Sequence, residues 1–228
     1  MENKVINIGV VVEIAKVLRD LREETVFVGG AVISLYTDDP AADEIRPTKD
    51  VDMTVNIASL SEWEKLQERL GELGFHPDPF AEHLCRYHYQ SIPVDIMSTE
   101  PGPLGPTNPW YKIGFEDLWT VQALDQAVRI LSPPCFLATK FEAYNDRGKD
   151  FRTSHDLEDI FYILDNRTTI VEEVEASDLR IKKFLKEELQ KMIDSSILGE
   201  ALVAHIHPLM REERIPLVTN KIYKIVSF

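Results

Sequence analysis

Hydrophobic and polar residues follow two different patterns along the chain, and the point where the pattern changes divides it in two. Up to about residue 130, strand-like stretches alternate with helical ones, whereas after Pro133-Pro134 only helical spacing remains. We therefore predict an α/β domain over residues 1–130 and a helical domain over residues 131–228. The expected fold class is α/β (α+β), with a small mixed twisted sheet and flanking helices followed by a C-terminal helical lobe.

Individual elements follow from the spacing of apolar residues and from turn residues. The stretch 50–57 alternates strictly and predicts a strand, and Ser61 with Glu64 predicts a capping box at the start of a helix. The stretch 101–109 is rich in proline and predicts a loop. The other predicted strands are 25–28, 84–89, 92–97 and an edge strand at 128–131; the predicted helices are 6–21, 31–36, 61–73, 135–146, 156–164, 178–193 and 213–225.

Composition and charge narrow the class of protein. The chain has 228 residues, of which 44% are hydrophobic, and a formal net charge of -14. Such a charge disfavours a protein that grips duplex DNA, because that affinity comes from Lys and Arg. No apolar run reaches the roughly 20 residues that cross a bilayer, and the polar N-terminus does not resemble a secretory signal. We therefore expect a cytoplasmic protein with no membrane partner, whose cysteines, Cys85 and Cys135, are reduced and bind no metal.

Three aspartates on predicted strands carry the candidate chemistry. Asp50 and Asp52 are two residues apart, so their carboxylates project from the same face of a strand. Asp95 lies between Val94 and Ile96 on another apolar strand, which a neighbouring position in the sheet would bring beside the pair. Carboxylate oxygens suit Mg²⁺, with Mn²⁺ as an alternative, and three of them can hold two ions. The alternative is a solvated strand edge with Asp95 as a surface charge.

A glycine pair upstream offers a place for phosphates. Val28-Gly29-Gly30-Ala31 follows a strand and leads into a predicted helix. Glycines let the backbone approach a triphosphate closely, and the start of a helix offers unpaired N–H donors. Taken alone, the pair is also compatible with a plain tight turn.

Together, these elements resemble the nucleotidyltransferase superfamily of polymerase-β type. The elements that carry the resemblance are Phe27-Val28-Gly29-Gly30, Thr48-Lys49-Asp50-Val51-Asp52 and Val94-Asp95-Ile96. The resemblance implies that Asp50, Asp52 and Asp95 are metal ligands and catalytic. It also implies that Gly29, Gly30 and Lys49 contribute to binding the nucleotide.

The second half resembles the AbiEii-type branch, the nucleotidyltransferase toxins of type IV toxin–antitoxin systems. The signature runs from Leu137 to Ala143 around Lys140, continues through Arg147-Gly148-Lys149-Asp150 and ends with Asp156 to Ile160. Lys140 and Arg147 are seven residues apart and share a helix face. By resemblance, Lys140 contacts the triphosphate as a catalytic and nucleotide-binding residue, and Arg147 supports the phosphates or the acceptor. Either Asp150 or Asp156 fills the family's aspartate position, with Asp159 as further support.

The leading hypothesis is transfer of a nucleoside monophosphate from an NTP to an acceptor hydroxyl with release of pyrophosphate. The toxin resemblance implies an RNA acceptor, such as the 3′ end of tRNA, and an antitoxin partner, while a small-molecule acceptor of the antibiotic type stays open. Two rival classes are a regulatory module that binds NTP without turnover and a metal-dependent phosphohydrolase. They differ from the leading hypothesis in the product, because neither places label from the NTP on an acceptor.

Overall fold

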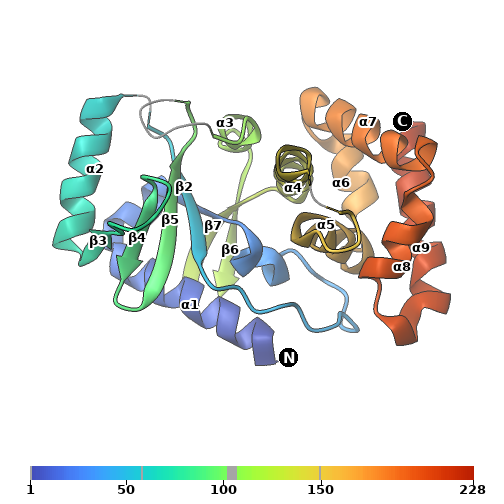
Figure 1. The fold of residues 1–228 in the computed structure, drawn as a ribbon, viewed down its shortest axis with the longest axis horizontal. Coiled ribbons are helices and arrows are strands. Elements are labelled where there is room, and N and C mark those ends of the chain that lie inside the picture. Colours follow the sequence, from blue (N-terminus) through green and yellow to red (C-terminus); the bar gives the residue numbers. More distant parts are fainter. Residues whose placement is uncertain (1, 58, 102–106, 149) are drawn as a thin grey trace. The chain divides into compact units, whose positions relative to one another are not determined.

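The computed structural model describes residues 2–57, 59–101, 107–148 and 150–228, with side chains from residue 6 onward (Figure 1). The chain forms two compact units. The first comprises Met1–Leu35 and Glu44–Ser132, and the second comprises Tyr36–Asp43 and Pro133–Phe228. The sequence-based boundary near residue 130 did not anticipate that the chain enters the second unit once before, at residues 36–43.

A mixed seven-stranded sheet forms the centre of the first unit, with the strand order β3-β4-β5-β2-β1-β7-β6. β2 pairs in parallel with β5, and β1 in parallel with β7, while the other neighbours are antiparallel. The mixed sheet with flanking helices, followed by a helical unit, confirms the expected α/β class. The strands are β1 (Thr25–Val28), β2 (Val51–Val55), β3 (Phe75–Pro77), β4 (Arg86–Tyr89), β5 (Ile92–Ser98), β6 (Leu118–Ala123) and β7 (Gln126–Leu131).

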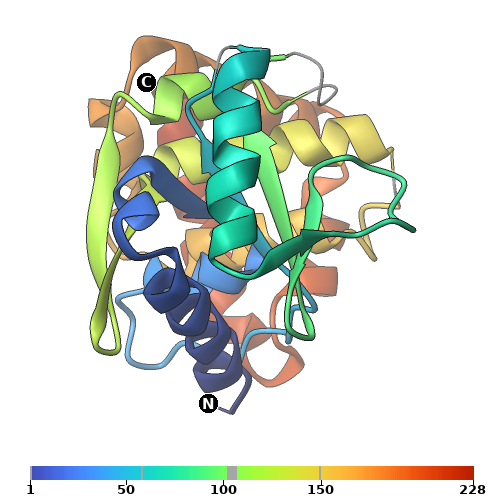
Figure 2. The same cartoon turned by 90° about the vertical axis from the view of Figure 1, so that its left-hand side faces the viewer.

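Two helices, α1 and α2, lie on the side of the first unit that faces the viewer in Figure 2. α2 packs on the sheet through Trp63, whose ring meets that of Tyr87 on β4 edge-on at 6.3 Å. α1 packs against β6 and β7. The helices of this unit are α1 (Glu2–Leu18), α2 (Leu60–Glu72) and α3 (Trp110–Gly114), with 3-10 helices η1 (Arg19–Glu24) and η2 (Gly30–Leu35).

The start of α2 corrects a detail of the prediction. The capping box is formed by Ser59 and Glu62: the Ser59 hydroxyl accepts from the Glu62 N–H at 3.3 Å, and the Ser59 N–H donates to Glu62 Oε2 at 2.9 Å. Ser61 and Glu64 have the same spacing two residues later. The helix therefore begins at Leu60, before the buried Trp63, and both hydrogen bonds of the capping box are formed.

The predicted edge strand at residues 128–131 is wrong in its position. β7 lies inside the sheet between β1 and β6, and β6 is the edge strand. β6 was missed because its side chains before Ala123 are exposed or half-buried and mix polar with apolar residues, which leaves no continuous apolar run. Its partner β7 keeps Val128, Ile130 and Leu131 fully buried.

The second unit is helical, and α4 and α9 each pack against several of the other helices. The early segment 36–43 joins it through backbone bonds: the N–H groups of Asp38 and Asp39 both donate to the Asn166 carbonyl at 3.2 Å. Its helices are α4 (Pro133–Arg147), α5 (His155–Asn166), α6 (Ile170–Ala176), α7 (Leu179–Asp194), α8 (Leu198–His205), η3 (Pro208–Met210) and α9 (Arg211–Ser227). Within the described residues, no helix is both long enough and apolar enough to cross a membrane.

Candidate active site

One row of residues crosses four strands of the sheet and contains two of the three predicted aspartates. Asp52 on β2 lies directly beside Asp95 on β5, Arg86 on β4 lies opposite Asp95, and Val28 on β1 lies opposite Asp52. Neighbouring strands are about 4.8 Å apart, and residues paired across strands project from the same face. The register therefore brings Asp52, Asp95 and Arg86 together on one face.

The other face of these strands explains why the row is polar. Val51, Val94 and Tyr87 alternate with the polar row and are buried, and the Tyr87 hydroxyl accepts from Gln67 of α2 at 3.0 Å. Alternation thus turns one face of the sheet toward α2 and leaves the opposite face to the charged side chains. The apolar residues between the aspartates fix the direction in which the carboxylates project.

Arg86 binds two of the aspartates, and the three residues form the Arg86 cluster (Arg86, Asp50, Asp95). Its Nε donates to Asp95 Oδ1 at 2.7 Å, and its Nη2 donates to Asp95 Oδ2 at 2.6 Å and to Asp50 Oδ2 at 3.1 Å. The hydrogen bonds to Asp95, and the charges of Asp95, Asp50 and Asp52, raise the pKa of Arg86 above its usual value against the effect of burial. The guanidinium is therefore held in its charged form.

The Arg86 cluster is open to solvent. The side chains of Arg86 and Asp50 are 35% and 36% exposed, and that of Asp95 is 19% exposed. Across the described ranges, no three or more His, Cys, Asp or Glu side chains form a ready-made metal site. The carboxylates of Asp50 and Asp95 are gathered by a guanidinium instead.

The predicted glycine turn lies against Asp52. Gly29 has φ +72, and a Cβ there would lie 1.8 Å from Asp52 Oδ2. A Cβ on Gly30 would lie 2.8 Å from Cγ2 of Thr48. Glycine is thus required at residue 29 both by the left-handed backbone and by the close approach of a predicted site residue. The turn opens into η2, a 3-10 helix of six residues, rather than into an α-helix.

The remaining predicted residue of the first unit is Lys49. It is exposed and precedes Asp50 in the irregular segment that leads into β2. Its side chain lies at the entry to the strand and contributes no hydrogen bond or ion pair among the parts of the chain that are described.

The predicted residues of the second unit form a separate group, the Lys140 cluster (Lys140, Arg147, Asp156, Asp159). Lys140 Nζ lies 2.6 Å from Asp159 Oδ2 and 3.6 Å from Asp156 Oδ1, and Arg147 Nη1 lies 2.6 Å from Asp156 Oδ2. The Lys140 side chain is 11% exposed and those of the two aspartates 3–4%. The structure thus brings the basic pair together with Asp156 and Asp159.

Asp150, the alternative to Asp156, lies elsewhere. Its carboxylate is exposed and pairs with Arg152 at 3.4 Å. The geometry therefore puts Asp156, rather than Asp150, in contact with the helix lysine. Lys149 of the same motif falls outside the described residues.

Arg86 was not among the predicted site residues, although the sequence holds a signal for it. A two-residue turn at Gln90-Ser91 sets Tyr89 opposite Ile92, and counting back along both strands sets Arg86 opposite Asp95. The register of a predicted hairpin was therefore enough to identify the cation beside the third aspartate.

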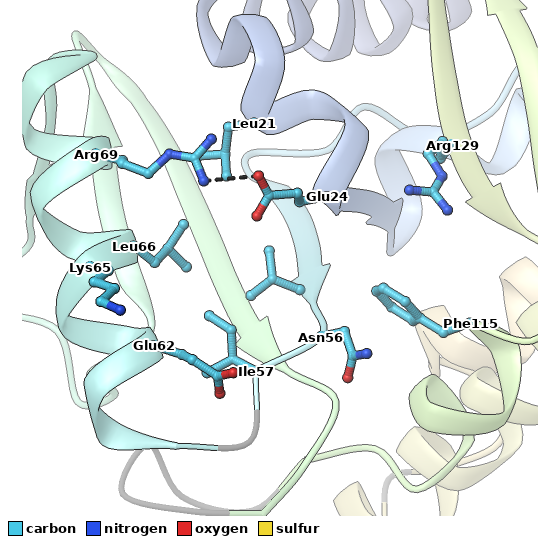
Figure 3. Close-up of a pocket in the computed structure, with 11 residues that line it drawn as sticks. Leu21, Glu24, Asn56, Ile57, Glu62, Lys65, Leu66, Arg69, Phe115 and Arg129 are labelled. Carbon is cyan, nitrogen blue, oxygen red and sulfur yellow. Dashed lines mark hydrogen bonds and ion pairs between the residues drawn. The ribbon is translucent and has the colours of Figure 1, made fainter.

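A hollow of about 410 Å³ lies at the other end of β2, beyond Val55. Figure 3 shows Phe115 and Arg129 on one side of it and Leu66 of α2 on the other. Arg69 there pairs with Glu24 at 2.9 Å. None of the predicted site residues lines this hollow, so it is separate from the aspartate row.

Comparisons with known proteins concern the fold and the family. A solved structure, an antigenic nucleotidyltransferase-like protein from Paracoccidioides brasiliensis, superposes with a TM-score of 0.52 at 20% identity, covering 88% of this chain and 93% of that one. The fold is thus nucleotidyltransferase-like. No curated protein matches the chain. A family model described as "Nucleotidyl transferase AbiEii toxin, Type IV TA system" matches residues 15–213. This match spans most of the chain, which therefore belongs to the AbiEii nucleotidyltransferase toxin family.

Proposed function

We propose that the protein transfers a nucleoside monophosphate from an NTP to an acceptor hydroxyl, with release of pyrophosphate, and that Asp50, Asp52 and Asp95 hold the divalent ions this needs. Family and fold support nucleotidyl transfer. The observation that carries the proposal is the register of β2 and β5, which sets Asp52 beside Asp95 on a face shared with a cation.

The donor set fits Mg²⁺. All three side chains offer hard oxygen ligands, and two of them already bind a positive group, the Arg86 guanidinium, so this position favours a cation. When bound, two such ions supply Lewis-acid stabilisation of the leaving pyrophosphate and make the acceptor hydroxyl easier to deprotonate.

The chain's own residues then have distinct tasks. Asp50, Asp52 and Asp95 would hold the ions, and Asp95 would also help to receive the proton of the acceptor hydroxyl. Gly29 keeps the backbone against Asp52 and, with Gly30, approaches the β- and γ-phosphates. Phosphate binding by Lys140 and Arg147 is part of the proposal on the strength of the family resemblance.

The family resemblance supports the acceptor that we propose. A toxin of a type IV system is expected to modify RNA, such as the 3′ end of tRNA, in the cytoplasm, and to be counteracted by an antitoxin protein. Because the net charge is -14, an RNA acceptor must bind through a local basic patch or reach the site only with its end. A small-molecule hydroxyl remains the alternative acceptor.

The test is transfer of label. The protein is incubated with each α-labelled NTP, Mg²⁺ and total RNA, or with a panel of aminoglycosides, and the products are separated. We expect label on a discrete RNA band and its loss in Asp95→Asn. Asp125→Asn, an exposed aspartate at the β6–β7 turn that pairs with Lys16, is the matched control and keeps activity.

The products of this experiment, together with calorimetry, distinguish the rival functions. Phosphate or pyrophosphate release without a labelled acceptor indicates a phosphohydrolase. Calorimetric binding of NTP with no release from any acceptor pool indicates a regulatory module. Undiminished transfer by Asp95→Asn refutes the role given to Asp95.

A further inference from the structure

Arg86 occupies the carboxylates that the proposed function assigns to metal. It takes both oxygens of Asp95 and one oxygen of Asp50. The carboxylates of Asp50 and Asp95 lie against the same guanidinium and repel each other, and the guanidinium offsets that repulsion. A divalent ion competes for the same oxygens and is itself repelled by the guanidinium, so the two cations disfavour each other.

The side chain of Arg86 is able to leave. It is 35% exposed and is based on β4, which is next to the edge strand β3. Its aliphatic stem can turn toward water without opening the sheet, because the ladder bonds of β4 involve only backbone. The Arg86 cluster therefore differs from a buried ion pair, which cannot open without stranding a charge.

We propose that Arg86 is an internal counter-ion: it holds Asp95 and Asp50 in place in the metal-free protein and is displaced when a divalent ion binds. The inference rests on the proposed function, because it takes the aspartates to be metal ligands. Arg86 is a positioning residue in this scheme. It lowers the affinity for free metal while it keeps the carboxylates aligned.

The sign of one measurement separates this role from a purely structural one. If Arg86 only supports the carboxylates, its removal loosens them and weakens metal binding. If Arg86 competes with metal, its removal strengthens metal binding and, at the same time, destabilises the metal-free protein. No rearrangement of the fold is needed for either result.

The experiment measures Mn²⁺ binding by the full chain without nucleotide, from the electron paramagnetic resonance signal of free Mn²⁺. Wild type is compared with Arg86→Gln, Arg86→Lys and Arg69→Gln. Arg69 is the matched control because it lies in the same unit, is 36% exposed and pairs with Glu24 and Asp20 away from the aspartate row. Any general effect of removing one positive charge appears in both glutamine variants.

We expect Arg86→Gln to bind Mn²⁺ about 10-fold more tightly, the scale of a partly exposed, charge-assisted pair. Arg69→Gln should stay near wild type. Arg86→Lys should lie between, because lysine keeps the charge and loses the two-point contact with Asp95. In EDTA, the melting temperature of Arg86→Gln should be lower than that of wild type. Saturating Mg²⁺ should raise the melting temperature of Arg86→Gln by more than it raises that of wild type.

Unchanged or weaker binding by Arg86→Gln, with wild type binding normally, overturns the counter-ion role and leaves the metal site standing. Absence of Mn²⁺ binding by all four proteins overturns the metal site and the counter-ion role together. If Arg86→Gln does not fold, Arg86→Lys decides the question: tighter binding than wild type supports the competition, and equal or weaker binding refutes it.

Discussion

The Arg86 cluster and the Lys140 cluster use the same ingredients in opposite surroundings. Each places a cation between two aspartates at distances of 2.6–3.6 Å. In the Arg86 cluster the side chains are 19–36% exposed, whereas in the Lys140 cluster the lysine is 11% and its aspartates 3–4% exposed. Arg147, which pairs with Asp156 from the outer side, is 56% exposed. Water and dissolved ions therefore reach the Arg86 cluster, and in the Lys140 cluster they reach Arg147 but hardly reach Lys140 and the two aspartates.

This difference shows that a charged motif does not by itself identify a ligand site. A buried pair must remain matched, because removing one partner leaves an uncompensated charge in a poorly solvated place. A partly exposed pair contributes little to stability and can exchange partners. The Lys140 cluster therefore has the character of a structural element of α4 and α5, whatever its part in phosphate binding, and the Arg86 cluster that of an exchangeable site.

The largest expected effect is on the stability of the buried cluster. Lys140→Met keeps the length of the side chain and removes the charge, which leaves Asp159 without its 2.6 Å partner. We expect the free energy of unfolding of the second unit to fall by about 3–5 kcal/mol. Arg86→Gln, without metal, should lower the stability of the first unit by less than about 1 kcal/mol.

Urea unfolding measures both changes. The tryptophans, Trp63, Trp110 and Trp119, all belong to the first unit, so their fluorescence reports that unit, while circular dichroism also follows the helices of the second. Equal losses in the two variants would remove the distinction between the clusters.

The next effect is on catalysis and belongs to the exposed row. Asp52→Asn should reduce nucleotidyl transfer by more than about 100-fold, since even groups that only orient metal ligands contribute 10–100-fold. Its stability should hardly change, because the substitution relieves repulsion with Asp95. Asp156→Asn should instead lose stability markedly, and this loss should be its larger effect. Initial rates with labelled NTP and melting curves give the two quantities for each variant.

A smaller effect is expected where the backbone approaches the row. Gly29→Ala places a Cβ 1.8 Å from Asp52 Oδ2 at a residue with φ +72. We expect a loss of about 1–2 kcal/mol of stability, together with slower transfer, because Asp52 must move. Gly71→Ala is the control, since a Cβ there meets nothing within 4 Å and an alanine in a helix is favourable. A Gly29→Ala protein as active and stable as wild type contradicts the close approach.

The smallest effect concerns a third pair, Asp39 with Arg214 in the second unit, at 2.6 Å. The hydrogen bond from Arg214, followed by that from the Ala41 N–H, lowers the pKa of Asp39 below the usual value of an aspartate. A lowered carboxyl pKa contributes stability that is present above about pH 4 and is lost as the pH falls through the folded value. Arg214 keeps a second carboxylate, that of Asp165 at 3.5 Å, when Asp39 is neutralised. Asp39→Asn should therefore be less stable at pH 7 by only about 1 kcal/mol and should lose less on acidification. Melting temperatures between pH 7 and pH 3 test this; parallel curves would contradict it.

The sequence predicted those parts of the molecule that have a strong periodic pattern. β2 and β5 alternate between apolar and polar residues, and this alternation set both the strands and the face on which Asp52 and Asp95 project. The family signature around Lys140 drew attention to α4 and α5, and the class of fold followed from the change of pattern at Pro133-Pro134.

The missed parts depend on contacts between distant residues. β3, α3, α6 and α8 are short, at three to eight residues, and too few apolar residues mark them. That β2 and β5 are neighbours could only be supposed, because the pairing of parallel strands is not encoded in either strand alone. The burial of Lys140 also depends on packing with α5, so its pairing with Asp159 was invisible to periodicity.

The path of the chain through residues 36–43 has a consequence for how the protein is made. During translation this segment leaves the ribosome long before Arg214 and Arg167, the residues that bind Asp39 and Asp38. These contacts of the second unit thus cannot form until Arg167 and Arg214 have been synthesised, although the first unit can close once residue 132 has emerged. A fragment starting at residue 133 would lack these aspartates, and supplying the segment 36–43 as a peptide should restore part of its stability.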